Sequence, residues 1–209
     1  MQARTIHPVQ GRYNLDTNNY SNSLDENLAC MESLRTLSGQ LHNAAKRCIT
    51  VLAQGGKLLI CGNGGSASEA QHLAGELVGR YKLDRSPLAA IALATDPAIM
   101  TSIGNDYCFE EVFSRQVRAL GRPGDLLIAF TTSGRSANIL NALKSAREIG
   151  IESISFLGRD GGAALKDTDC ALIVNHRDTA RIQEGHLFLV HCLMDLIEAG
   201  LTGRQQHSG

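Results

Sequence analysis

Residues 57–81 read KLLICGNGGSASEAQHLAGELVGRY and predict one complete strand–loop–helix unit. Lys57 to Gly62 form a short apolar run that is typical of a buried strand. The next residues, Asn63 to Ser66, are small and rich in glycine, which favours a tight turn. A helical pattern then runs from Ala67 to Tyr81. A buried strand that passes through a glycine loop into a helix is the repeating unit of α/β proteins.

The same kind of unit recurs along the rest of the chain. Further apolar strands are expected at 88–94, 125–130, 151–157 and 170–175. Helices are expected at 96–120, 137–150, 179–201 and, with a weaker pattern, 161–166. Asp96 and Pro97 suit the cap and the first position of the helix they begin. Because the strands are continuous apolar runs, we predict a parallel five-stranded sheet with helices on both faces, a three-layer α-β-α sandwich.

The N-terminal part has a different character. Residues 1–22 are polar, and we expect a loose arm there. Apolar residues recur at helical spacing up to Gln54 and predict a long helical segment, 23–54, which Gly39 could divide into two helices. Such a segment could pack against a partner subunit. Residues 23–209 are therefore interpreted as a single domain, with this helical segment and an α/β core at 55–201.

Composition excludes several classes of function. The chain has 209 residues, of which 43% are hydrophobic, and a net charge of −1, which argues against a phosphate-neutralising nucleic-acid surface. Six cysteines without a CxxC pair indicate a reduced, cytoplasmic protein. No secretory signal is expected at the N-terminus. No apolar run approaches about 20 residues, so we expect no membrane-spanning helix.

Two loops have the composition of an anion site. They are CGNGGSAS at 61–68 and TTSGRS at 131–136, and each precedes a helix at the carboxyl end of a strand. Free N–H groups and the helix dipole favour an anion at that position. The alternative to an anion site at 131–136 is that Ser136 only caps its helix. Four hydroxyls in six positions, however, exceed what a cap requires. Neither loop carries a nucleotide-binding P-loop, and no GxGxxG opens the first helix.

Four polar residues on two predicted helices form a candidate metal or acid–base set. His72 and Glu76 lie four residues apart on one face of a helix, and Gln183 and His191 lie eight apart on another. Imidazole and carboxylate are zinc ligands. His186 lies near the same face as His191. A solvated surface pair for the first two residues and a core position for His191 remain the alternatives, because spacing alone does not show that the helices converge.

Four segments together resemble a known family. CGNGGSASEAQHLAGELVGRY, IGNDY, TTSGRSANIL and RIQEGHLFLVH are similar, in order and spacing, to the phosphoheptose isomerases of the sugar isomerase (SIS) domain superfamily. The resemblance extends from about Gly55 to Leu201 and implies a flavodoxin-like fold. It implies aldose–ketose isomerisation of D-sedoheptulose 7-phosphate to D-glycero-D-manno-heptose 7-phosphate, in the biosynthesis of heptose for lipopolysaccharide or other glycans. It also implies a homotetramer that binds a phosphosugar, with one Zn²⁺ per subunit. The composition adds the expectation of a cytoplasmic protein that binds neither nucleic acid nor membrane.

The resemblance also implies roles for individual residues. The implied zinc ligands are His72, Glu76, Gln183 and His191. The implied acid–base residues are Glu76 and His191. The implied substrate-binding residues are Asn63, Gly64, Gly65, Ser66, Glu76, Asn105, Asp106, Thr131, Thr132, Ser133, Ser136 and Gln183. Two positions depart from the family pattern: Thr131 replaces a serine but keeps its hydroxyl, and Arg135 replaces an asparagine.

Three alternatives remain at this stage. The first is a non-catalytic SIS relative that binds the bacterial replication initiator protein as a tetrameric scaffold, against which the presence of both Glu76 and His191 counts. The second is an isomerase for another sugar phosphate, since the 131–136 loop would serve any of them. The third is a sugar-phosphate sensor, which would need no metal. The residue types themselves suit enediol chemistry, which needs a base and an acid beside adjacent carbons.

Overall fold

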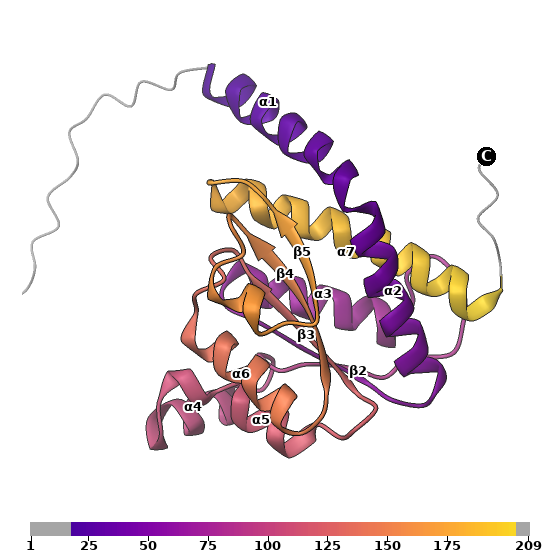
Figure 1. Ribbon diagram of the computed structural model, residues 1–209, viewed down its shortest axis with the longest axis vertical. Coiled ribbons are helices and arrows are strands. Elements are labelled where there is room, and N and C mark those ends of the chain that lie inside the picture. The colour runs from indigo at the N-terminus through magenta and orange to yellow at the C-terminus, as the bar shows by residue number, and fades with distance from the viewer. Residues whose placement is uncertain (1–17, 204–209) are drawn as a thin grey trace, which may run out of the picture.

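The computed structural model describes residues 18–203 and contains a single five-stranded parallel sheet among them (Figure 1). Its strands are β1 (Leu58–Gly62), β2 (Ala90–Ala92), β3 (Leu126–Thr131), β4 (Glu152–Gly158) and β5 (Cys170–Val174). Their spatial order is β2-β1-β3-β4-β5, and every neighbouring pair is parallel. All five predicted strands are present, although β2 is shorter than the expected 88–94.

Helices cover both faces of this sheet, which confirms the three-layer α-β-α sandwich. One face carries α2 (Ser38–Ala53), α3 (Gly65–Val78) and α7 (Thr179–Thr202), and the other carries α4 (Pro97–Asp106), α5 (Ser114–Leu120) and α6 (Ala137–Glu148). Alternate strand residues supply the two cores. Ile128 faces the first group of helices, whereas its neighbour Leu127 faces the second.

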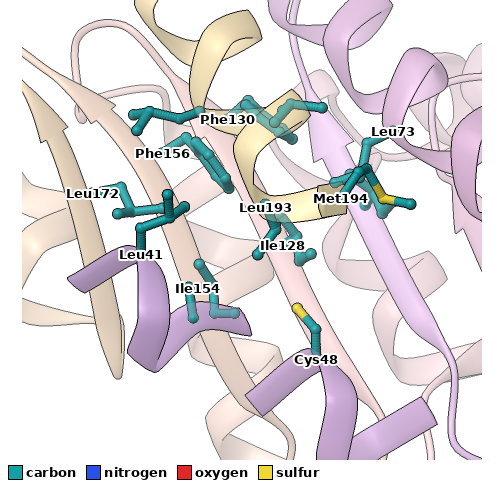
Figure 2. Close-up of a cluster of buried hydrophobic side chains, with 14 of the residues drawn as sticks. Leu41, Cys48, Leu73, Ile128, Phe130, Ile154, Phe156, Leu172, Leu193 and Met194 are labelled. Carbon is teal, nitrogen blue, oxygen red and sulfur yellow. The ribbon is translucent and has the colours of Figure 1, made fainter. Parts of the chain in front are cut away.

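Figure 2 shows the first of these cores. Leu41 and Cys48 of α2, Leu73 of α3, and Leu193 and Met194 of α7 point toward the sheet. They meet side chains of the three strands β3, β4 and β5, which are Ile128, Phe130, Ile154, Phe156 and Leu172. Helices α2, α3 and α7 therefore share one continuous core, which fixes α3 and α7 relative to each other.

The N-terminal helical segment differs in detail from its prediction. It consists of α1 (Asn18–Ser33), the short 3₁₀ helix η1 (Leu34–Leu37) and α2. The expected division into two helices is present, but the break lies at 34–37, just before Gly39, which is the second residue of α2. Leu34 is buried in the core, so a turn there lets the chain change direction onto the sheet. Residues 18–22 of the expected polar arm are helical, and the rest of that arm lies outside the described residues.

The remaining differences follow from local chemistry. The expected helix 96–120 is divided into α4, the 3₁₀ helix η2 (Phe109–Glu111) and α5. Asp96 caps α4 as predicted, because its carboxylate accepts hydrogen bonds from the N–H groups of Ala98 and Ile99. The weak helix expected at 161–166 is the 3₁₀ helix η3 (Ala163–Lys166).

Helix α7 corrects the expectation about apolar length. Among residues 18–203 it is the one helix long and apolar enough to cross a membrane by length and composition alone. In the fold, however, it packs beside α2 and α3, and nine of its residues are buried. This pattern is that of a core helix in an α/β protein.

Candidate active site

A pocket opens where the order of the sheet reverses. β1 lies between β2 and β3, and the helices that follow β1 and β3 pass to opposite faces of the sheet. Ligands of open α/β sheets bind at such a switch point. The pocket there has a volume of about 170 Å³. We call it the switch-point pocket, and its lining residues are Asn63, Ser66, Phe130, Thr131, Thr132, Ser136, Thr179 and Gln183.

The first loop needs its glycines for geometric reasons. Gly64 has a φ of +57°, a backbone conformation that side chains rarely adopt. A Cβ on Gly62 would lie 2.3 Å from the carbonyl oxygen of Ser66, so the chain can turn this tightly only without one. Asn63 then forms a reciprocal amide pair with Asn138, with N···O distances of 2.9 and 2.8 Å. Asn138 thus fixes the orientation of Asn63, a role that its spacing in the sequence did not reveal.

The hydroxyl-bearing residues of the second loop differ in whether they line the switch-point pocket. Thr131 Oγ1 accepts a hydrogen bond from Gly134 N–H at 3.1 Å, and Ser133 Oγ accepts one from Arg135 N–H at 3.2 Å. Thr131, Thr132 and Ser136 line the pocket, whereas Ser133 does not. Ser136 occupies the N-cap position of α6, yet its side chain makes no capping hydrogen bond. The simple capping alternative for Ser136 is therefore not realised, and its hydroxyl is available to a ligand.

Two helices bring the predicted histidines together. His72 Nε2 and His191 Nε2 are 3.0 Å apart, and their rings meet edge to face. Glu76 Oε1 lies 3.6 Å from His72 Nε2. Tyr81 stacks on His191, with ring centroids 5.8 Å apart. The contact between His72 of α3 and His191 of α7 shows that the two helices converge here. We refer to His72, Glu76 and His191 as the histidine cluster.

His186, by contrast, is the core histidine. It is completely buried, and its Nε2 donates to the carbonyl oxygen of Leu157 at 3.1 Å. His191 is only partly buried. The core position considered for His191 therefore belongs to His186.

Gln183 lies away from the histidine cluster. It lines the switch-point pocket, where its amide packs so closely on Gly65 that a Cβ there would lie 2.4 Å from Nε2. Eight residues separate Gln183 from His191, a rise of about 12 Å along a helix. The structure thus divides the four implied zinc ligands into a cluster of three and a separate glutamine.

The distances within the histidine cluster suit one metal ion only in part. Ligand atoms bound tetrahedrally to zinc at about 2.0–2.2 Å lie about 3.3–3.6 Å from one another. The separations of 3.0 and 3.6 Å measured from His72 are close to this value. Among residues 18–203, however, no three His, Cys, Asp or Glu side chains form a complete metal-binding group. The donor types and two of the distances fit zinc, and a bound ion would require a small movement of Glu76 or His191.

The remaining implied site residues do not line the pocket. Asn105 and Asp106 are exposed at the end of α4, where the Asn105 amide donates to the Asp106 carboxylate at 2.8 Å. Arg135 is exposed and forms an ion pair with Asp160 at 3.0 Å. Gly64 and Gly65 shape the first loop without lining the pocket. Thr179, the first residue of α7, does line it and was missed, because the sequence gives no sign that the start of α7 reaches the switch point.

Comparison with known proteins agrees with this architecture. The SIS domain family matches residues 20–158. The chain is 49% identical over 181 residues to the phosphoheptose isomerase of Trichlorobacter lovleyi, covering 86% of this chain and 92% of that protein. It is 51% identical over 170 residues to the phosphoheptose isomerase of Helicobacter pylori, covering 81% and 88%. The solved phosphoheptose isomerase GmhA from Neisseria gonorrhoeae superposes with a TM-score of 0.83 at 44% identity, covering 87% of this chain and 98% of that one.

Proposed function

This chain belongs to the phosphoheptose isomerase family of SIS domain proteins, which isomerise sedoheptulose 7-phosphate in heptose biosynthesis, and from this premise we propose how its own residues perform that reaction. The reaction forms D-glycero-D-manno-heptose 7-phosphate. It moves a proton between C1 and C2 of the sugar through an enediol, which requires a base at the carbons and an acid at the oxygens.

We place the phosphate of the substrate in the switch-point pocket. Thr131, Thr132 and Ser136 present hydroxyls there. Because the side chain of Ser136 does not cap α6, the first N–H groups of that helix also remain for an anion. Asn63, Ser66 and Gln183 would contact the sugar next to the phosphate.

We place the reacting carbons at the histidine cluster. Six residues of α3, a rise of about 9 Å, separate Ser66 in the pocket from His72. A seven-carbon sugar phosphate in an open, extended form has a comparable length. The spacing along α3 therefore favours a long substrate whose phosphate and carbonyl ends are bound at different turns of one helix. The distance along α3 between the pocket and His72 is the observation that favours a heptose phosphate over a shorter sugar phosphate.

Glu76 and His191 are proposed as the base and the acid. Glu76 is partly buried, its carboxylate lies 3.6 Å from His72 Nε2, and Tyr81 stacks on His191. His72 would hold a zinc ion together with one or both of them, and bound zinc would polarise the carbonyl oxygen of the sugar. A carboxylate bound to zinc is a weaker base, so ligation and proton transfer by Glu76 would belong to different states of the enzyme.

A homotetramer in the cytoplasm completes the proposal. Tyr20, Leu24 and Leu28 recur every four residues on α1 and are exposed, as are Leu187 and Phe188 on α7. Apolar side chains exposed on one helix face mark an interface. Asn105 and Asp106 do not line the pocket of their own chain, which supports a site that uses residues of a neighbouring subunit. A monomeric variant should then be inactive, and an active monomer in dilute gel filtration would contradict the shared site.

The decisive experiment measures turnover of sedoheptulose 7-phosphate together with bound metal. The untreated enzyme, chelated enzyme and zinc-restored enzyme are compared with Glu76→Gln. Activity that chelation removes and zinc restores supports the metal-dependent reaction. If Glu76→Gln loses activity but keeps its full zinc content, Glu76 acts as the base. If the variant loses both activity and zinc, Glu76 is a zinc ligand. Glu148→Gln is the matched control, because Glu148 is exposed at the end of α6. Absence of turnover with zinc present would instead favour the scaffold protein that binds a replication initiator.

A further inference from the structure

A second pocket lies at the carboxyl ends of β4 and β5, the two strands on the far side of β3 from the switch point. It has a volume of about 510 Å³, three times that of the switch-point pocket, and the two share no lining residue. We call it the arginine pocket. Its lining residues are Arg135, Arg159, Asp160, Asn175, His176 and Arg177. Arg159 and Asp160 directly follow β4, Asn175 to Arg177 directly follow β5, and Arg135 comes from the 131–136 loop.

The charge of this pocket is positive and only partly neutralised. Three arginines face one aspartate, so the lining carries a net charge of +2 with neutral His176. Both oxygens of Asp160 are already engaged: Oδ2 accepts from Arg135 at 3.0 Å, and Oδ1 accepts from Gly162 N–H at 3.0 Å. Asp160 therefore balances Arg135, and the charges of Arg159 and Arg177 remain uncompensated.

Uncompensated arginines are a minority within the part of the chain that the structure describes. Of the arginines between residues 18 and 203, only Arg80, Arg159 and Arg177 lack a side-chain hydrogen bond, ion pair or ring contact. Two of these three line the arginine pocket. Both side chains are exposed, so solvent screens their charges, and they are available to a bound anion.

The backbone holds the two segments that carry these arginines together. The carbonyl oxygen of Val174 accepts hydrogen bonds from both Arg159 N–H at 3.1 Å and His176 N–H at 2.9 Å. Arg159 has a φ of +57° and is the one non-glycine residue with positive φ in the described chain. His176 Nδ1 accepts from Asp178 N–H at 3.0 Å, which leaves the proton of the neutral ring on Nε2. Nε2–H is then a further donor for an anion.

We propose that the arginine pocket binds an organic diphosphate, and that this site regulates the enzyme separately from its substrate pocket. One guanidinium group can donate two parallel hydrogen bonds to the oxygens of one phosphate. Two uncompensated arginines therefore match a ligand with two linked phosphates better than a ligand with a single phosphate. The volume exceeds what a single phosphate fills and lies within the range of ligand pockets. Binding here does not depend on the isomerase mechanism, so the two proposals can fail separately.

A structural link connects this pocket to the substrate pocket. Gly134 lies against the 159–162 loop so closely that a Cβ on it would be 2.0 Å from Gly161 O. Arg135, which is paired with Asp160 of that loop, is followed directly by Ser136 of the substrate pocket. A ligand that draws Arg135 or Asp160 toward itself would therefore shift the loop that holds the substrate phosphate. By linkage, substrate and diphosphate would then alter each other's affinity.

The test is calorimetric titration of the whole protein with inorganic pyrophosphate. Wild type should bind one pyrophosphate per chain at this site. Arg159→Gly with Arg177→Ala should weaken binding by about tenfold or more, because two charged hydrogen-bonding groups are lost. Glycine is chosen at 159 because it suits the positive φ, so thermal stability should not fall. Arg177→Ala alone, in an exposed turn, should weaken binding by a smaller factor without loss of fold.

Two comparisons make the titration decisive. Arg35→Ala with Arg147→Ala removes the same charge elsewhere on the surface, and it should bind pyrophosphate as wild type does. Ser136→Ala should also retain binding. The proposal is overturned if wild type does not bind, if the control pair weakens binding equally, or if Ser136→Ala alone abolishes it, since pyrophosphate would then occupy the substrate pocket. Orthophosphate bound as tightly as pyrophosphate would overturn the assignment to a diphosphate.

Discussion

Glu69 Oε2 and His186 Nδ1 face each other at 3.6 Å between α3 and α7, and neither atom has a hydrogen-bond partner among the described residues. His186 already donates its Nε2 proton to Leu157 O. A neutral ring then offers Glu69 only a bare nitrogen, and two buried acceptors would be left facing each other. A donor in place of one of these acceptors would convert the contact into a hydrogen bond. The pair joins the two helices that carry the histidine cluster.

Two substitutions at Glu69 should show whether a hydrogen bond to His186, and not the charge of the carboxylate, matters for the free energy of unfolding. Glu69→Gln keeps the shape and supplies an N–H that can donate to His186 Nδ1, so we expect unfolding free energy close to that of wild type. Glu69→Ala leaves a cavity beside His186 Nδ1 and supplies no donor to it, so it should cost about 2–3 kcal/mol. Urea unfolding of both variants at one protein concentration measures this. Equal destabilisation by the two variants would show that the amide introduced by Glu69→Gln does not donate to His186 Nδ1.

The carboxylate of Glu198 should make stability depend on pH in the acidic range. Burial alone would raise its pKa, but hydrogen bonds from the N–H groups of Leu83 and Lys82 and from Arg85 outweigh burial and hold the pKa below its usual value. A lowered pKa stabilises the folded state fully above the ordinary glutamate pKa, about 4.3. That stabilisation is lost as the pH falls through the lower pKa of the folded protein.

Glu198→Gln is the variant that isolates this effect. At pH 7 it should reduce the unfolding free energy by about 3 kcal/mol, because Arg85 loses its buried partner. The difference between wild type and Glu198→Gln should shrink as the pH is lowered from 5 toward 3, since wild-type Glu198 then also becomes neutral. A difference that stays constant over this range would contradict the lowered pKa.

The fold could be predicted from the sequence because its signals are local. Each strand is a continuous apolar run, and each loop that matters carries glycines where a Cβ would collide, as at Gly62 with Ser66 O. The cap at Asp96 was predictable for the same reason. The break before Gly39 was not, because it depends on the burial of Leu34 against the sheet and not on the glycine itself.

The site was only partly predictable, because it depends on how helices meet. The spacing of His72 and Glu76 defines one face of α3, but it does not state which residue of α7 that face contacts. The structure pairs His72 with His191 and Gly65 with Gln183, since α3 and α7 run in the same direction. That register separates Gln183 from the histidines, and no pattern within either helix reveals it.

Arg135 should contribute to substrate affinity more than to turnover. Its guanidinium pairs with Asp160 and is 63% exposed, so it does not point at the reacting carbons. Arg135→Ala should raise KM about two- to threefold through loss of a cation near the phosphate loop, with kcat largely unchanged. Steady-state kinetics with sedoheptulose 7-phosphate measures both, with Arg147→Ala as the control. A large fall in kcat at constant KM would contradict this role.

Gly65 should be essential for the position of Gln183 without being essential for folding. A Cβ at residue 65 would lie 2.4 Å from Gln183 Nε2 and 2.9 Å from Cδ. These atoms belong to the end of a side chain, so Gly65→Ala can be accommodated if Gln183 moves. Its φ is not positive, so alanine adds no backbone strain. We expect kcat/KM for sedoheptulose 7-phosphate to fall tenfold or more, a loss of about 1.4 kcal/mol of transition-state stabilisation.

Gly75→Ala is the matched control on the same helix, because no atom lies within 4 Å of its added Cβ. Alanine in a helix interior is favoured over glycine by up to about 1 kcal/mol, so this variant should be more stable than wild type and equally active. Gly65→Ala gains part of the same helical preference and should retain its thermal midpoint. Loss of activity at 65 with stability retained, beside full activity at 75, would place the defect in the displaced Gln183 amide. Full activity of Gly65→Ala would mean that the position of Gln183 in the pocket is not required for turnover.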